Sequence, residues 1–110
     1  MEVNIEGANI DAFDQLRASA DKASQLMKAM ANTDRLMLLC QLSQGEKTVS
    51  ELENLLGLRQ PSLSQQLTVL RDASLVSTRR EGKNMIYNIS SPAALAVMQV
   101  LYRELCQKDK

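Results

Sequence analysis

Residues 60 to 68 of the 110-residue chain carry a close run of side chains that form hydrogen bonds without ionising. They are Gln60, Ser62, Ser64, Gln65, Gln66 and Thr68. Amides and hydroxyls can bond to base edges in the major groove of DNA, where glutamine suits the N6 and N7 atoms of adenine. Side chains that could contact phosphates follow at Arg71, Arg79, Arg80, Lys83 and Asn84. The chemistry indicated by this stretch is recognition by hydrogen bonds and charge.

Covalent chemistry could come from two cysteines, Cys40 and Cys106. A thiolate is a nucleophile, and it can be oxidised or joined to a second sulfur. The chain has no histidine, which removes the commonest general base and the commonest zinc ligand, and two cysteines are too few for a structural zinc site. We therefore expect no metal, no cofactor and no enzymatic activity. On the residues alone, the commoner role for such cysteines is simple apolar packing.

Length and composition limit the fold to one domain of the mainly α class. A chain of 110 residues has little room for a second core, and its three aromatic residues leave Leu, Met, Val, Ile and Ala to build the first. The formal net charge is zero, but residues 1–34 carry a net −3 and residues 57–88 a net +3. A phosphate backbone responds to the local field within about 10 Å. The asymmetry therefore favours nucleic acid as a partner, although ordinary surface scatter could produce it.

Nothing in the chain predicts a membrane segment. No apolar run approaches the roughly 20 residues needed to span a bilayer. The first nine residues are acidic and lack the basic residue that opens a secretory signal. We therefore expect a cytoplasmic protein, in which thiols stay reduced unless they act as sensors.

The spacing of apolar side chains predicts one domain over residues 11–108, preceded by a flexible arm at residues 1–10. The expected elements are helices over residues 12–31, 34–42, 49–56 and 60–73, strands over 75–80 and 84–89, and a last helix over 92–107. Apolar residues at every third or fourth position indicate the helices, and alternation indicates the strands. Thr48 and Glu51 match a capping box at the start of the third helix, and Gly57 suits its end.

The third and fourth helices and the two strands form a recognisable unit. The fourth helix places Leu63, Leu67 and Leu70 on one face and polar residues on the other, which is typical of the second helix of a helix-turn-helix. A basic turn, Glu81-Gly82-Lys83, joins the strands into a β-hairpin, or wing. We predict a winged helix-turn-helix whose fourth helix enters the major groove and whose wing contacts phosphates. A solvated helix face is the alternative for the paired glutamines.

Apolar stripes on the first and last helices are not needed by a core that the middle helices already supply. We therefore predict a homodimer joined through helices 12–31 and 92–107. Two reading helices about 34–36 Å apart would match a palindromic operator in double-stranded DNA. The same stripes could instead pack on their own domain.

The order of elements, together with particular residues, resembles the ArsR/SmtB family of bacterial winged-helix repressors over about residues 20–107. The residues that carry the resemblance are Ala29-Met30-Ala31-Asn32, Arg35-Leu36, Gln60-Pro61, Ser64, Leu67, Leu70-Arg71 and Leu75-Val76. The resemblance implies a nucleoid-associated bacterial homodimer that leaves DNA when an inducer binds. Many members have a histidine at or near Gln66 and a glycine in place of Ser74.

The metal-sensing role of many family members does not carry over to this chain. Their thiolate motif would fall at Glu51-Leu52-Glu53-Asn54, which has no cysteine, and their other sites use histidine, which the chain lacks. We therefore expect the inducer to be something other than a metal ion.

The positions of Cys40 and Cys106 are similar to those in the BigR/SqrR/HlyU-type subgroup of the family. This resemblance implies that an inorganic or organic persulfide, or an oxidant, joins the two cysteines by a disulfide or polysulfide bridge, and that DNA binding is then lost. Arg103 and Lys110 would favour the thiolate of Cys106, whereas the leucines around Cys40 would raise its pKa. We therefore expect Cys106 to react first and Cys40 to resolve.

Other functions stay open on the sequence. The chain could be a redox-sensitive anti-repressor or activator that displaces a silencer from DNA. It could use the winged helix only to bind protein. A thiol oxidoreductase or sulfurtransferase is the least favoured, because the chain has neither a Cys-x-x-Cys pair nor a histidine.

Overall fold

The computed structural model describes residues 10–106 of the chain. Its elements in chain order are α1 (Ile10–Met30), α2 (Thr33–Leu42), β1 (Lys47–Thr48), α3 (Val49–Leu56), α4 (Ser62–Asp72), β2 (Val76–Glu81), β3 (Asn84–Ile89), α5 (Pro92–Leu101) and the π-helical turn η1 (Tyr102–Cys106). Ile10 begins α1 and so does not belong to the predicted arm, whose other residues lie outside the described part. The last two residues of the predicted domain, 107 and 108, also lie outside it.

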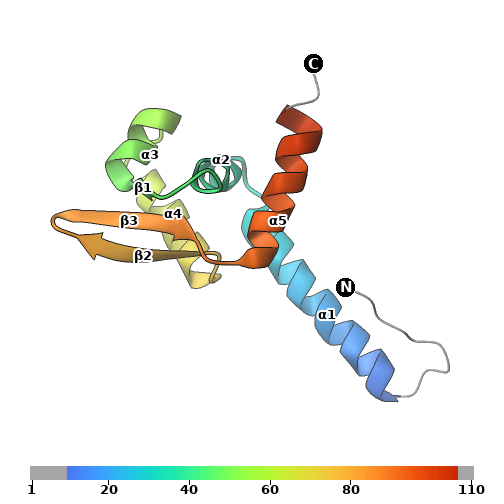
Figure 1. The fold of residues 1–110 in the computed structure, drawn as a ribbon. Coiled ribbons are helices and arrows are strands. Elements are labelled where there is room, and N and C mark those ends of the chain that lie inside the picture. Colours follow the sequence, from blue (N-terminus) through green and yellow to red (C-terminus); the bar gives the residue numbers. More distant parts are fainter. Residues whose placement is uncertain (1–9, 107–110) are drawn as a thin grey trace.

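The predicted winged helix-turn-helix is confirmed (Figure 1). Helices α3 and α4 form the helix-turn-helix, and the antiparallel strands β2 and β3 form the wing. The wing turn is shorter than predicted, because Glu81 pairs with Asn84 and leaves only Gly82 and Lys83 between the strands. Gly82 has φ 63°, a left-handed conformation that glycine adopts without steric cost. The predicted last helix is present, but its final turn is π-helical.

A third strand, β1, was missed by the sequence prediction. It has two residues, too few for an alternating pattern, and it pairs with β3 through Lys47↔Tyr87 and Thr48↔Ile86. The sheet order is β1-β3-β2. Thr48 also caps α3: its Oγ1 accepts from the Glu51 N–H at 3.1 Å, and Glu51 Oε1 accepts from the Thr48 N–H at 2.8 Å. The predicted capping box is therefore confirmed, and it joins the wing to the start of α3.

Left-handed residues end both helices of the helix-turn-helix. Gly57 has φ 70°, and its N–H donates to Glu53 O, as the sequence predicted. Ser74 has φ 63°, and the bonds from Ser74 N to Arg71 O and from Leu75 N to Leu70 O form a Schellman motif. The hydrogen-bonded turn therefore holds a serine in a conformation that glycine adopts more easily.

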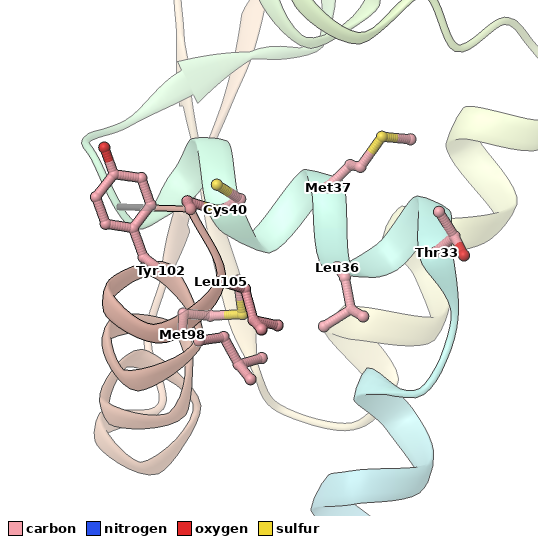
Figure 2. Close-up of a pocket in the computed structure, with 9 residues that line it drawn as sticks. Thr33, Leu36, Met37, Cys40, Met98, Tyr102 and Leu105 are labelled. Atoms are coloured by element: carbon pink, nitrogen blue, oxygen red, sulfur yellow. The ribbon is translucent and has the colours of Figure 1, made fainter. Parts of the chain in front are cut away.

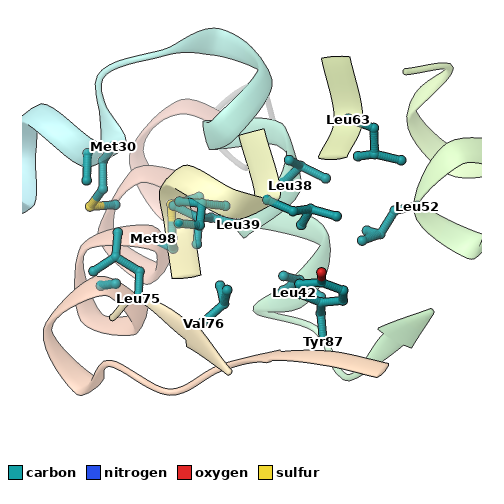
Figure 3. Close-up of a cluster of buried hydrophobic side chains, with 14 residues drawn as sticks. Met30, Leu38, Leu39, Leu42, Leu52, Leu63, Leu75, Val76, Tyr87 and Met98 are labelled. Carbon is teal, nitrogen blue, oxygen red and sulfur yellow. The ribbon is translucent and has the colours of Figure 1, made fainter. Parts of the chain in front are cut away.

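The core lies where α2, α3, α4 and the sheet meet (Figure 3). Its largest fully buried side chains are Leu38, Leu39, Leu52, Leu63, Leu67 and Leu70. The leucine face predicted for the fourth helix is confirmed. Helix α5 adds Ala94 and Met98, and β3 adds Tyr87. Packing of this kind fixes the orientation of α4, so that its opposite face is held outward.

Helix α1 contributes only its last turns to this core, through Leu26, Ala29 and Met30. The rest of α1 projects away from the domain, on the side opposite the wing tip (Figure 1). Phe13 and Met27 are 56% and 66% exposed. The apolar stripe of the first helix is therefore not covered by its own domain over most of its length. Within residues 10–106, no helix has the length and apolar character to cross a membrane.

Candidate DNA-binding surface and dithiol pocket

The outward face of α4 carries the predicted hydrogen-bonding side chains. Ser62, Ser64, Gln65 and Thr68 are exposed, and Gln66 is half-buried. Gln60 lies just before the helix and is also exposed. The six predicted positions are therefore brought together at the first two turns of α4 and the residue leading into them.

Two of these side chains bond to each other. Gln60 Oε1 accepts from Ser64 N at 3.1 Å and from Ser64 Oγ at 2.5 Å. Pro61 holds the N-cap position of α4 but makes no side-chain cap bond. Gln60 therefore satisfies a backbone N–H in the first turn that would otherwise lack a partner. The bond between Gln60 and Ser64 thus stabilises the first turn of α4, whatever else these side chains contact.

Gln66 is held by Arg35, a residue that sequence reasoning did not assign to the site. Arg35 Nη1 donates to Gln66 Oε1 at 2.8 Å. The same guanidinium donates from Nε to Ala29 O at 2.6 Å and from Nη2 to Lys28 O at 3.4 Å, at the end of α1. One planar group therefore ties α1, α2 and α4 together. The contact joins residues 31 positions apart, so local spacing could not reveal it.

Charges on the wing differ in how free they are. Arg79 lies 2.8 Å from Glu46 and 3.5 Å from Glu81. The hydrogen bond from Arg79, followed by one from Asn88, lowers the pKa of the Glu46 carboxyl. Arg80 and Lys83 are exposed, and no ion pair involves either of them within residues 10–106. Part of the charge of Arg79 is therefore already balanced, whereas Arg80 and Lys83 keep theirs.

The remaining predicted contacts lie on the same two elements. Arg71 is exposed in the last turn of α4, and Asn84 is exposed at the start of β3. Together with the free wing cations they extend the polar face of α4 with groups that suit phosphate oxygens.

The two cysteines line one pocket, although they lie far apart in the sequence. The pocket is about 270 Å³ and lies between α2 and the C-terminal helix, which comprises α5 together with η1 (Figure 2). Its lining residues are Thr33, Leu36, Met37, Cys40, Met98, Leu101, Tyr102, Leu105 and Cys106. Cys40 is half-buried on α2, Cys106 is exposed at the end of η1, and both are free thiols. The lining is mainly apolar, and the thiols of Cys40 and Cys106 are its nucleophilic groups.

The environments of the two thiols are unequal. Burial raises the pKa of the Cys40 thiol, and negative charge on Cys106 raises it further. The predicted direction for Cys40 is confirmed. The Nε of Arg103, which we expected to favour the Cys106 thiolate, lies 3.3 Å from Glu104 Oε2. Its charge is therefore shared with a carboxylate, and Lys110 lies outside the described residues.

A metal site was not expected, and the described part of the chain offers no candidate. Within residues 10–106, no group of three or more Cys, Asp or Glu side chains could hold a metal ion.

A helix-turn-helix with an outward polar face and a basic wing defines a winged-helix DNA-binding protein. Residues 32–78 match the bacterial regulatory protein, arsR family. The chain is 45% identical over 91 residues to the biofilm growth-associated repressor of Agrobacterium fabrum, with 83% of this chain and 78% of the relative covered. The chain belongs to the ArsR family. It is a transcriptional regulator, and its relatives are named as regulators and not as enzymes.

Two further proteins are similar to it. The transcriptional activator HlyU of Vibrio cholerae is 41% identical over 96% of this chain and 97% of the relative. The structure of reduced HlyU from that organism has a TM-score of 0.82, with 42% identity over 84% of this chain and 98% of that one. A homodimeric winged helix-turn-helix domain from Mycobacterium bovis has a TM-score of 0.72, with 30% identity over 83% of this chain and 84% of that one.

Proposed function

We propose that the chain is a sequence-specific DNA-binding repressor that releases its operator when Cys40 and Cys106 are joined by a persulfide or an oxidant. The observation that carries this proposal is the presence of both free thiols in one pocket between α2 and the C-terminal helix. The similarity to a protein named as a repressor supports the direction of the response.

DNA binding is assigned to α4 and the wing. The predicted base contacts lie in the first half of α4 and just before it, which is the part of a recognition helix that reaches base edges. They are Gln60, Ser62, Ser64, Gln65, Gln66 and Thr68. The predicted phosphate contacts are Arg71, Arg79, Arg80, Lys83 and Asn84. Since Arg79 is paired with carboxylates, Arg80 and Lys83 supply most of the affinity from the wing.

The active form is a homodimer on a palindromic operator. Exposed apolar side chains on α1, such as Phe13 and Met27, and on the C-terminal helix, such as Val100 and Leu105, support joining through these helices. A neighbouring structure is described as homodimeric, which supports the same assignment. Two copies would present two α4 helices to successive major grooves.

The bridging chemistry balances with a persulfide as the oxidant. The Cys106 thiolate attacks the outer sulfur of R–S–SH, the S–S bond breaks, and RS⁻ leaves, so that Cys106 becomes the persulfide Cys106–S–SH. The Cys40 thiolate then attacks the inner sulfur, a Cys40–Cys106 disulfide forms, and the outer sulfur leaves with its proton as HS⁻. A second sulfur transfer before closure would leave an additional sulfur in the bridge. The more exposed Cys106 acts first because the incoming persulfide can reach it.

Release of DNA follows from the position of Cys40 on α2. The same helix carries Arg35, whose guanidinium holds Gln66 of α4. A covalent tie between α2 and the C-terminal helix therefore acts on elements that position the reading helix and the dimer. A coupling of about 1–3 kcal/mol would weaken DNA binding roughly 5- to 150-fold.

The test uses fluorescence anisotropy with an operator duplex selected by the reduced protein. Treatment with an organic persulfide should weaken binding by the stated factor for the native chain and have no effect on Cys40→Ser or Cys106→Ser. Ser43→Ala serves as a control near Cys40, because it removes the hydroxyl that donates to Cys40 O at 2.6 Å and leaves both thiols. If Cys106→Ser responds like the native chain, the assignment of that cysteine is wrong.

A redox-sensitive anti-repressor or activator is the alternative, because one similar protein is named as an activator. In that case the reduced protein would displace a silencer from DNA. Footprinting with and without a competing silencer separates the two. A repressor protects the promoter in the absence of the silencer, whereas an anti-repressor changes transcription only when the silencer is present.

A further inference from the structure

The orientation of the Gln66 amide is fixed by its partner. A guanidinium only donates hydrogen bonds, so the Gln66 atom that lies 2.8 Å from Arg35 Nη1 must be the oxygen. The amide nitrogen Nε2 must therefore point away from Arg35. A free glutamine could rotate its amide to suit either hydrogen-bonding pattern, but this one cannot do so without losing a charge-assisted bond.

Arg35 is itself held in place, so it cannot follow a rotating amide. Its Nε donates to Ala29 O at 2.6 Å, and its Nη2 donates to Lys28 O at 3.4 Å. These carbonyls lie in the last turn of α1, where helix carbonyls lack partners within the helix. The backbone N–H of Arg35 donates to Asn32 Oδ1 at 3.0 Å. The guanidinium that contacts Gln66 is therefore positioned by two backbone carbonyls of α1.

The outward nitrogen is available to a ligand. Within residues 10–106, no buried side-chain nitrogen or oxygen lacks a hydrogen-bond partner, and no protein acceptor is recorded for Gln66 Nε2. Nε2 therefore reaches solvent. It does so on the face of α4 that carries the exposed neighbours Ser62 and Gln65.

We propose that Gln66 reads DNA as a hydrogen-bond donor only, with Arg35 as its positioning residue, and that it selects guanine over adenine. The inference rests on the proposed placement of α4 in the major groove. Paired recognition of adenine needs an amide oxygen to accept from N6 while the nitrogen donates to N7. With its oxygen turned toward Arg35, Gln66 presents the N–H groups of its amide on the outward side. Guanine presents two acceptors, O6 and N7, whereas adenine would direct its N6 donor at the amide donor.

The assignment contrasts with that of Gln65. Gln65 is exposed, and no side-chain hydrogen bond is recorded for it in the described part of the chain. It keeps the freedom to pair with adenine through both amide atoms. The two adjacent glutamines would therefore read different bases, although the sequence alone predicted the same preference for both.

The test is selection of preferred sites from a random DNA pool by the reduced native chain and three variants. Gln66→Glu keeps an acceptor for Arg35 but replaces the outward donor with an acceptor oxygen. It should abolish a guanine preference of roughly 5- to 150-fold at one base pair of each half-site and favour a base that offers a donor. Arg35→Lys cannot hold both α1 and the amide, so adenine should become accepted at that same base pair. Gln65→Glu, the matched control, should change a different base pair.

The outcomes separate this inference from the proposed function. If the native chain prefers adenine at the Gln66-dependent base pair, or if Gln66→Glu changes no base preference, the donor assignment is wrong. If Arg35→Lys leaves the ratio of guanine to adenine unchanged, Arg35 is not the positioning residue. DNA binding by the native chain would survive each of these results, whereas absence of salt-sensitive binding to any site would overturn the proposed function as well.

Discussion

The reading face of α4 and the pocket between α2 and the C-terminal helix are built in opposite ways. On α4, Gln60 is bonded to Ser64 and Gln66 to Arg35 before any ligand arrives. In the pocket, Cys40 and Cys106 line the same space but remain free thiols. The first region therefore has some of its polar groups fixed in advance, whereas the bond proposed for the second region has not formed.

This difference is suited to regulated DNA binding. Preorganised side chains lose little freedom when they meet DNA, so the reduced protein can bind without rearrangement. In the proposed mechanism, a bridge between Cys40 and Cys106 would change how α2 and the C-terminal helix are held together. Because Arg35 and Cys40 lie on the same helix, the change has a short route to the reading face.

The largest effect is expected from breaking the support of the reading helix. Leu67→Ala removes a side chain that is only 2% exposed, and it should lower the free energy of unfolding by about 2–5 kcal/mol. Thr68→Ala, the next residue on the exposed face, should change it by less than about 0.5 kcal/mol. Urea denaturation of both variants provides the measurement. Equal losses would mean that α4 is not held by the leucine face.

The next effect concerns the rate at which the proposed bridge between Cys40 and Cys106 forms. Burial raises the pKa of Cys40, so only a small fraction is thiolate near neutral pH. Since the thiolate is the nucleophile, bridge formation should accelerate by about tenfold per pH unit between about pH 6 and pH 8. Intact mass measured at intervals after persulfide addition gives the rate. A rate that does not depend on pH would show that deprotonation of Cys40 does not limit closure.

The smallest effect distinguishes the cations of the wing. Arg80→Ala should lower the slope of log affinity against log salt by about 0.9, because one phosphate contact is lost. Between about 50 and 200 mM salt, the variant should therefore lose about threefold less affinity than the native chain does. Arg79→Ala should change the slope less, since Glu46 and Glu81 already neutralise part of its charge. A larger change for Arg79→Ala would mean that DNA displaces these carboxylates.

Local signals in the sequence predicted the local structure well. The capping box at Thr48 and Glu51, the left-handed Gly57 and the buried leucine face of α4 all depend on residues within one or two turns of each other. Features that depend on distant residues were not accessible in this way. Strand β1 forms because Lys47 pairs with Tyr87 on β3. The Gln66 amide is fixed because Arg35, which is distant in the sequence, donates a hydrogen bond to it.

The cysteine pair shows the same limit. Apolar spacing placed each cysteine on its helix but gave no reason for the two to share a pocket. Only the family resemblance suggested that they act together, and the structure then placed both in the lining of one pocket. The ion pair between Arg79 and Glu46 was also not predicted. Glu46 lies between two predicted helices, in a segment for which the sequence predicted no helix or strand.

The central claim is that the sulfur bridge itself causes release of DNA. The most direct measurement separates persulfide-treated protein into DNA-bound and free fractions and determines the intact mass of each without reduction. We predict that the free fraction carries the mass of a Cys40–Cys106 disulfide or polysulfide bridge, and that the bound fraction keeps the mass of two free thiols. The same distribution of bridged protein in both fractions would contradict the account.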